Sequence, residues 1–140
     1  MARDEYLDHL AAVPLFAQCT KGQLQEIGRV ADELRVSAGT ILARQGDVGT
    51  ELFVIIDGTA AVTRDGQPVA TVGRGGFVGE LAVLARVPRN ATVTAETDLD
   101  VLVLTPTGLS QLLDDIPGLA KHLLQEVVDR LVATSVDPSE

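Results

Sequence analysis

Apolar residues recur at helical spacing at the start of the chain. Leu7, Leu10 and Ala11 would share one face of a helix over residues 5–13. Pro14 would end that helix or force a turn, because proline disfavours helical geometry in the residue before it.

A second helix is predicted over residues 21–34. Thr20 precedes it and is a suitable N-cap, since its hydroxyl can accept from an unpaired N–H of the first turn. Gly22 and Gly28 weaken this helix by roughly 1 kcal/mol each relative to alanine, so packing must support it. The expected apolar stripe is Leu24, Ile27, Ala31 and Leu34.

From about residue 35 the pattern changes to short segments of β-forming residues separated by glycines. The predicted strands are residues 40–44, 51–57, 59–64, 67–72, 91–95 and 100–105. Short strands at this spacing are typical of an all-β sandwich or barrel. Asp65 and Gly66 predict a two-residue hairpin turn, and the apolar run 52–56 predicts a central strand.

The last third is predicted to be helical again. Thr105 would cap a helix over residues 106–115 with Pro106 at its first position, and Pro117 would end it. A final helix over residues 119–133 carries two apolar rows. These rows are Leu119, Leu123, Val127 and Leu131, and beside them Ala120, Leu124, Val128 and Val132. One packing surface needs a narrower stripe, so we expect a partner, with a second copy of the chain as one candidate.

Composition limits the function. The 140 residues carry a formal net charge of −9, which argues against direct nucleic-acid binding. No stretch has the character of a signal peptide or the length of a membrane span. Cys19 is the only cysteine, so an intrachain disulfide and a thiolate metal cluster are excluded. We therefore expect a soluble cytoplasmic protein.

The segment over residues 75–95, GGFVGELAVLARVPRNATVTA, resembles the phosphate-binding cassette of cyclic nucleotide-binding domains. That family includes the catabolite activator protein and the regulatory subunits of cAMP-dependent protein kinase. The matching residues are Gly75, Val78, Gly79, Glu80, Leu81, Ala82, Val83, Leu84, Pro88, Arg89, Asn90, Ala91, Thr92 and Val93. With weaker matches on either side, the likeness covers roughly residues 7–133.

The resemblance implies a fold that is mostly β with flanking helices. In detail it implies an eight-stranded jelly-roll barrel with an N-terminal helical segment, a short cassette helix and C-terminal lid helices. The domain would occupy residues 1–134, and residues 135–140 would be a polar tail or the start of a linker.

The chemistry of the cassette suits a cyclic phosphodiester. A helical turn starting near Gly79 would present unpaired N–H groups to an anion, and glycine lets the backbone approach closely. Arg89 can donate to two phosphate oxygens at once. An ionised Glu80 only accepts, so it suits the free 2′-hydroxyl of the ribose. The resemblance assigns the same roles to Glu80 and Arg89, and gives the phosphate oxygens to backbone amides around Leu81, Ala82 and Ala91.

The base is expected against aliphatic strand residues and beneath the last helix. The strand candidates are Val62, Val72 and Val93, and the lid candidates are Leu123, Leu124 and Val127. Asn90 stands where family members more often have alanine, serine or threonine, and it could contact a guanine amino group or the phosphate. We favour cAMP over cGMP as the ligand.

The expected function is a cyclic nucleotide sensor that performs no catalysis and holds no metal. Binding would draw the cassette and the last helix together. The effector domain or partner protein cannot be named from the sequence. The chain is either a fragment of a larger regulator or a stand-alone receptor.

Two alternatives remain at this stage. The first is a regulatory module of the same fold whose degenerate pocket binds no nucleotide. The second is a metal-dependent jelly-roll enzyme, although His9 and His122 are far apart in sequence and on predicted helices.

Overall fold

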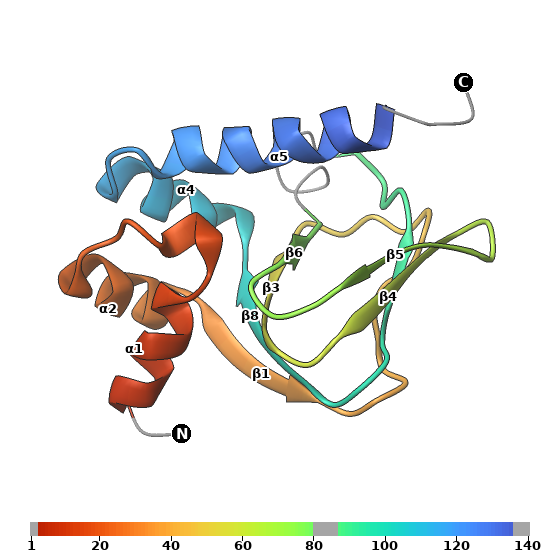
Figure 1. Ribbon diagram of the computed structural model, residues 1–140, viewed down its shortest axis with the longest axis horizontal. Coiled ribbons are helices and arrows are strands. Elements are labelled where there is room, and N and C mark those ends of the chain that lie inside the picture. The colour runs from red at the N-terminus through yellow and green to blue at the C-terminus, as the bar shows by residue number, and fades with distance from the viewer. Residues whose placement is uncertain (1–2, 80–86, 136–140) are drawn as a thin grey trace.

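The computed structural model describes residues 3–79 and 87–135 of the chain. Its helices are α1 (Arg3–Ala11), the short 3-10 helix η1 (Pro14–Phe16), α2 (Lys21–Val30), α4 (Pro106–Asp115) and α5 (Leu119–Ser135). Its strands are β1 (Asp32–Val36), β2 (Ile41–Ala43), β3 (Leu52–Asp57), β4 (Ala60–Arg64), β5 (Gln67–Val72), β6 (Phe77–Val78), β7 (Thr92–Ala95) and β8 (Leu99–Leu104). Figure 1 shows the helices gathered on one side of the strands, with α5 running along the edge of the molecule.

Helix α2 begins as predicted and ends earlier. The Thr20 hydroxyl accepts from the Gln23 N–H at 3.1 Å, and the Gln23 side chain accepts from the Thr20 N–H at 2.8 Å. This is a complete capping box. The predicted extension of the helix to residue 34 is wrong, because the chain leaves helical geometry at Ala31 and pairs as β1 with β8.

Two residues assigned to helical faces are exposed. Leu34 lies on β1 opposite Val101 and is 47% exposed, so it belongs to no helical stripe. Five paired positions with β8 fix the backbone there, and this pairing outweighs the spacing of one leucine. Ala11, the last residue of α1, is also exposed, whereas Leu7 and Leu10 are buried.

The strands form two four-stranded sheets, ordered β1-β8-β3-β6 and β2-β7-β4-β5, with antiparallel neighbours. The prediction that residues 52–56 form a central strand is confirmed, since β3 lies between β8 and β6. The fold is mostly β with flanking helices, as expected. The described strands do not close into the barrel that we expected, because each sheet keeps two edge strands.

Strand β3 is apolar from Leu52 to Ile56 because both of its faces are covered there, and only its last residue, Asp57, is polar and exposed. Leu52, Val54 and Ile56 face a large cluster that also contains the buried residues of α1, α2, α4 and α5. Phe53 and Ile55 face a second cluster, between the two sheets. Because successive side chains of a strand point to opposite faces, a strand covered on both sides needs no polar position.

The predicted hairpin connects β4 and β5. Asp65 has φ +53 and Gly66 has φ +78, as a two-residue turn of this kind requires. Asp65 is the only non-glycine residue with positive φ in the described part of the chain.

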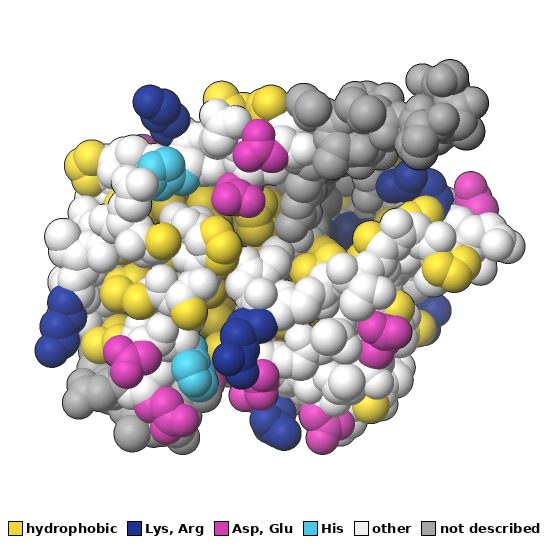
Figure 2. Space-filling model, viewed as in Figure 1, with side chains coloured by type: hydrophobic (Ala, Val, Ile, Leu, Met, Phe, Trp, Pro, Cys, Tyr) yellow, Lys and Arg dark blue, Asp and Glu magenta, His cyan; other side chains and the backbone are white. Residues whose placement is uncertain are grey.

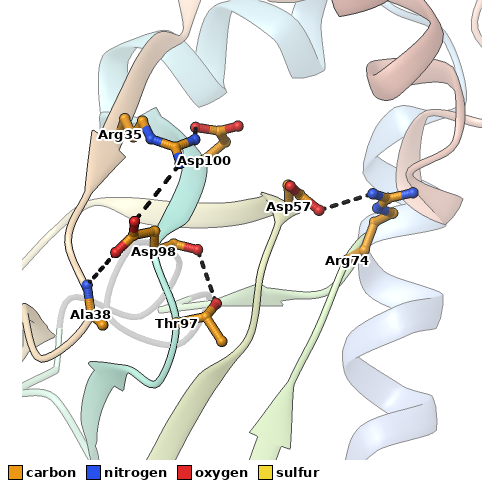
Figure 3. A network of polar contacts seen from close by, with 7 residues as sticks. All are labelled: Arg35, Ala38, Asp57, Arg74, Thr97, Asp98 and Asp100. Carbon is orange, nitrogen blue, oxygen red and sulfur yellow. Dashed lines mark hydrogen bonds and ion pairs between the residues drawn. The ribbon is translucent and has the colours of Figure 1, made fainter.

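Two ion pairs are made by exposed arginines. Arg35 donates to the Asp100 carboxylate at 2.9 Å, and Arg74 donates to Asp57 at 2.9 Å (Figure 3). The hydrogen bond from Arg74 holds the pKa of Asp57 below its usual value. Figure 2 shows acidic and basic side chains interspersed over one face of the molecule.

No helix in the described ranges is both long and apolar enough to cross a membrane. Nor do residues 3–79 and 87–135 contain three or more His, Cys, Asp or Glu side chains grouped as metal ligands.

Candidate functional site

The backbone of Arg89 is fixed by the loop between β2 and β3. The Gly46 N–H donates to the Arg89 carbonyl at 2.8 Å, and the Arg89 N–H donates to the Asp47 carbonyl at 2.9 Å. Two opposed hydrogen bonds of this kind hold a residue much as a strand partner would. The segment that leads into β7 therefore has a defined backbone before any ligand binds.

The side chain of Arg89 is buried, with only 6% of its surface exposed. Its Nη2 atom lies 3.4 Å from a carboxylate oxygen of Glu51, and its Cζ lies 5.6 Å from the ring centroid of Phe53. The first contact is longer than the 2.7–2.9 Å of a strong charge-assisted hydrogen bond. Glu51 is 44% exposed, so water also reaches this carboxylate. The Arg89–Glu51 ion pair is therefore a loose one.

Two glycines make room for the guanidinium. A Cβ atom added to Gly49 would overlap the Nε, Cζ and Nη2 atoms of Arg89, and one added to Gly79 would overlap Nη1. Gly79 also has φ +93, which a larger residue rarely adopts. Gly79 was predicted to let the backbone come close to a ligand, and it lies directly against the cation predicted to bind that ligand's phosphate.

A cavity of about 530 Å³ opens beside Arg89. It runs along β2 and the β2–β3 loop, and its walls include Ile41, Arg44, Asp47 and Glu51. This volume is in the range of small-molecule sites. None of Val62, Val72 and Val93 is among its wall residues, so this cavity differs from the base-binding surface predicted from the sequence.

Some of the residues predicted from the cassette are described and others are not. Glu80, Leu81 and Ala82 lie outside the described residues, as does the predicted cassette helix. Ala91 and Val93 are buried next to Arg89 in the chain.

The structure does bring the aliphatic residues predicted to line the base together. Val62 and Val72 pack against the cluster between the sheets, and Val62 lies opposite Val93 in the β4–β7 register. Asn90 is exposed, and its carbonyl accepts from the Nε of Arg64 at 2.9 Å.

The predicted lid residues differ in burial. Leu123 and Val127 are buried in the cluster of helices, whereas Leu124 is 62% exposed. Val128, one turn further along α5, is also exposed. Of the two predicted rows, Leu119, Leu123 and Val127 therefore pack inward, and Ala120, Leu124 and Val128 face solvent; the side chains of Leu131 and Val132 lie outside the described residues.

Sequence reasoning missed Glu51, Phe53 and Gly49. Glu51 is 38 positions from Arg89, and no local pattern relates the two. Gly46 and Gly49 belong to the glycines that separate the predicted strands, and their spacing in one loop is the sequence signal for a close approach.

Two antiparallel sheets of short strands, helices on one side and a buried arginine beside a cavity define a ligand-binding β domain. The chain belongs to the cyclic nucleotide-binding domain family, whose model matches residues 33–115, more than half of its length.

Known proteins agree with this assignment. The chain is 35% identical over 121 residues to a cyclic nucleotide-gated potassium channel of Rhizobium etli, covering 86% of this chain and 34% of the channel. It is 34% identical over 118 residues to a cAMP-dependent protein kinase regulatory subunit of Schizosaccharomyces pombe, covering 84% of this chain and 29% of that protein. The chain thus spans about a third of the length of the curated relatives it matches.

A solved structure shares the fold. The cAMP-bound structure of PfPKA-R superposes with a TM-score of 0.78 at 25% identity, covering 98% of this chain and 49% of that one. These proteins are regulatory or ligand-binding by their names.

Proposed function

We propose that this chain is a cyclic nucleotide sensor domain whose ligand is cAMP, and that it performs no catalysis itself. The observation that carries the proposal is the buried Arg89 guanidinium, held between two glycines that admit no side chain. A guanidinium buried beside a cavity offers an anionic ligand a charged, directional donor. A cyclic phosphate supplies one negative charge with oxygens spaced for a guanidinium.

The remaining contacts follow the cassette. Glu80 accepts from the ribose 2′-hydroxyl, and backbone N–H groups around Leu81, Ala82 and Ala91 donate to phosphate oxygens. The base rests against the aliphatic surface of Val62, Val72 and Val93. The likeness to cAMP-dependent kinase regulatory subunits and to a cAMP-bound structure supports cAMP over cGMP.

We further propose that residues 1–134 form the sensor, with the two sheets arranged as a jelly roll, and that residues 135–140 are a polar tail or the start of a linker. Occupancy would act by moving the cassette toward α5, where Leu123, Leu124 and Val127 would cover the base. Such a switch requires unequal affinity for the two arrangements. The output would reach an effector domain or a partner protein in the cytoplasm, where cyclic nucleotides are made.

Isothermal titration with cAMP and cGMP tests the proposal. Parent protein should bind cAMP more tightly. Arg89→Ala should cost about 2–5 kcal/mol of that affinity, because the phosphate loses a buried charge partner. Arg89→Lys keeps the charge and loses the planar guanidinium, so its cAMP affinity should lie between those of the parent and of Arg89→Ala.

A thermal scan gives an independent reading. At a hundredfold excess over Kd, bound ligand should stabilise the fold by about 2.7 kcal/mol. No shift with either nucleotide at millimolar concentration would instead indicate a regulatory module with a ligand-free pocket.

A further inference from the structure

Three segments that are distant in the sequence meet around the backbone of Arg89 and Asn90. The β2–β3 loop holds both backbone groups of Arg89, through Gly46 and Asp47. The β4–β5 turn holds the next carbonyl, since Arg64 Nε donates to the Asn90 oxygen at 2.9 Å. The loop and the turn are themselves joined by the side chain of Gln45.

Gln45 uses its whole side-chain amide in this junction. Its Nε2 donates to the Asp65 carboxylate at 2.8 Å, and its Oε1 accepts from the Asp65 N–H at 2.8 Å. Its own backbone N–H donates to the Thr92 hydroxyl at 3.0 Å, at the first residue of β7. Gln45 is exposed, yet it bonds both to Asp65 in the β4–β5 turn and to Thr92, which follows the Arg89 segment.

Asp65 is suited to the junction by its backbone. It adopts a left-handed φ of +53 while its N–H donates to Gln45, and aspartate tolerates this geometry better than most residues. The same turn positions Arg64 one residue earlier, where its guanidinium reaches the Asn90 carbonyl.

We propose that Gln45 and Arg64 are positioning residues of the nucleotide site. With Asp65 they form a clasp, here called the hairpin clasp, which fastens the β4–β5 turn to the β2–β3 loop and to Asn90. The clasp keeps the backbone of Arg89 and Asn90 in the geometry that binds the ligand. This inference rests on the proposed function, because it names what holds the phosphate-binding residue in place.

The effect on binding follows from the population of the competent state. An apparent dissociation constant is the intrinsic value divided by the fraction of molecules in the binding geometry. If loss of the clasp leaves that geometry populated about a tenth of the time, affinity falls about tenfold. The bonds involved are solvent-accessible, so the loss of global stability should be small by comparison.

A polarity swap isolates the clasp. Gln45→Glu replaces the donor to Asp65 with a second carboxylate, so one hydrogen bond becomes a repulsion. Asp65→Asn keeps an acceptor for Gln45 and keeps a residue that tolerates positive φ, so it should bind like the parent. The double variant restores a donor–acceptor pair with reversed polarity and the net charge of the parent.

Two readouts are needed in each variant. Titration with cAMP should show about tenfold weaker binding for Gln45→Glu and near-parental binding for the double variant. Amide hydrogen exchange of ligand-free protein should show the Arg89 N–H exchanging about tenfold faster in Gln45→Glu, with protection restored in the double variant.

Arg64 is tested against a matched arginine. Arg64→Ala should weaken cAMP binding severalfold through loss of the bond to the Asn90 carbonyl. Arg35→Ala removes the same charge from an exposed arginine on β1, in the sheet that does not contain Arg64. Arg35 pairs with Asp98 and Asp100 (Figure 3). Its substitution should leave affinity unchanged.

The possible results distinguish a failure of the clasp from a failure of the proposed function. If Gln45→Glu lowers the melting temperature and changes neither cAMP affinity nor Arg89 exchange, the residue is merely structural and the clasp is refuted. Equal losses in Arg64→Ala and Arg35→Ala would refute the role of Arg64 by showing a general charge effect. If the parent binds no cyclic nucleotide, the proposed function fails, and the Arg89 exchange rates still decide whether the clasp fixes this backbone.

Discussion

The Glu51 carboxylate lies 3.4 Å from the Arg89 guanidinium, and a bound phosphate would have to share the guanidinium with it or displace it. Glu51 immediately precedes β3, and Arg89 lies in the segment before β7. Because Glu51 remains half exposed while Arg89 is buried, the carboxylate can turn toward water when a stronger anion arrives.

Glu51→Gln should therefore tighten cAMP binding. The substitution removes a competing charge from a pair worth up to about 1 kcal/mol, so affinity should rise by up to about fivefold. The ligand-free fold should lose a similar amount of stability, because the buried cation loses a counter-charge. Titration and denaturant unfolding of the ligand-free protein measure the two effects. Glu96→Gln, an exposed carboxylate on the β7–β8 connection, is the control and should change neither.

Gly49→Ala should damage the site by overlap alone. The new Cβ would collide with the guanidinium of Arg89, while the backbone of Gly49 has no positive φ to oppose it. Overpacking of this kind costs about 1–3 kcal/mol of stability, and a displaced arginine should weaken cAMP binding more than tenfold. Gly73→Ala is the control, because it is the same substitution and its Cβ would only touch Thr59 at 3.9 Å. It should leave cAMP affinity unchanged. Parental affinity in Gly49→Ala would show that the Arg89 guanidinium does not need the space that Gly49 leaves.

Tyr6 should make the fold sensitive to alkali. Its pKa is raised to about 12, mainly by burial and secondarily by the Glu33 carboxylate. The unfolded phenol ionises near pH 10, so this contribution to stability is intact below pH 10 and is lost as pH rises from about 10 to about 12. With the phenol partly exposed, we expect a loss of about 1 kcal/mol, measured by denaturant unfolding at pH 8 and 11.5.

Tyr6→Phe is the control for that dependence. The Tyr6 hydroxyl is buried and has no hydrogen-bond partner among the described residues. Its removal should leave stability at neutral pH unchanged or raise it by up to about 1 kcal/mol, and should abolish the alkaline loss. Since Tyr6 is the only tyrosine and the chain lacks tryptophan, ultraviolet titration of the phenolate reports this residue alone. A midpoint near 10 would refute the shifted pKa.

The last helix offers a prediction that separates packing from ligand contact. Leu123→Ala should cost about 2–5 kcal/mol of stability, because Leu123 is buried in the helical cluster. Leu124→Ala should leave unfolding almost unchanged, because Leu124 is exposed. If Leu124 covers the bound base, its loss should weaken cAMP binding severalfold. Unchanged affinity would remove it from the lid.

Self-association is tested with the same row. Leu124 and Val128 present adjacent apolar surface to solvent, and Leu124→Lys would place a charge in any contact made there. Sedimentation of parent protein across a concentration series, with and without cAMP, should show a dimer that Leu124→Lys dissociates. A monomer at every concentration would reject a homodimer through α5.

The sequence predicted those parts of the fold that depend on local chemistry. The Thr20 and Thr105 caps, the start of α4 at Pro106 and the turn at Asp65 were all confirmed, because each follows from the residue at that position. The end of α2 was wrong, since pairing with β8 is a non-local interaction. β1 was missed for the same reason, and the two-residue β6 is too short to carry a pattern.

The site divides in a similar way. Arg89 could be found because it lies within one continuous motif. Glu51 and Phe53 could not, because their contacts with Arg89 depend on how β3 is placed beside the β7 segment. Gln45 and Arg64 were equally hidden, since their bonds join segments 20 or more positions apart.

Because the residues around Arg89 come from distant parts of the sequence, the site can form only late in synthesis of the domain. The Gly46, Arg64 and Arg89 segments can meet only after the ribosome has released the chain beyond residue 92, and closing such long loops delays assembly. A nascent chain that has not yet released these segments therefore lacks the assembled surroundings of Arg89.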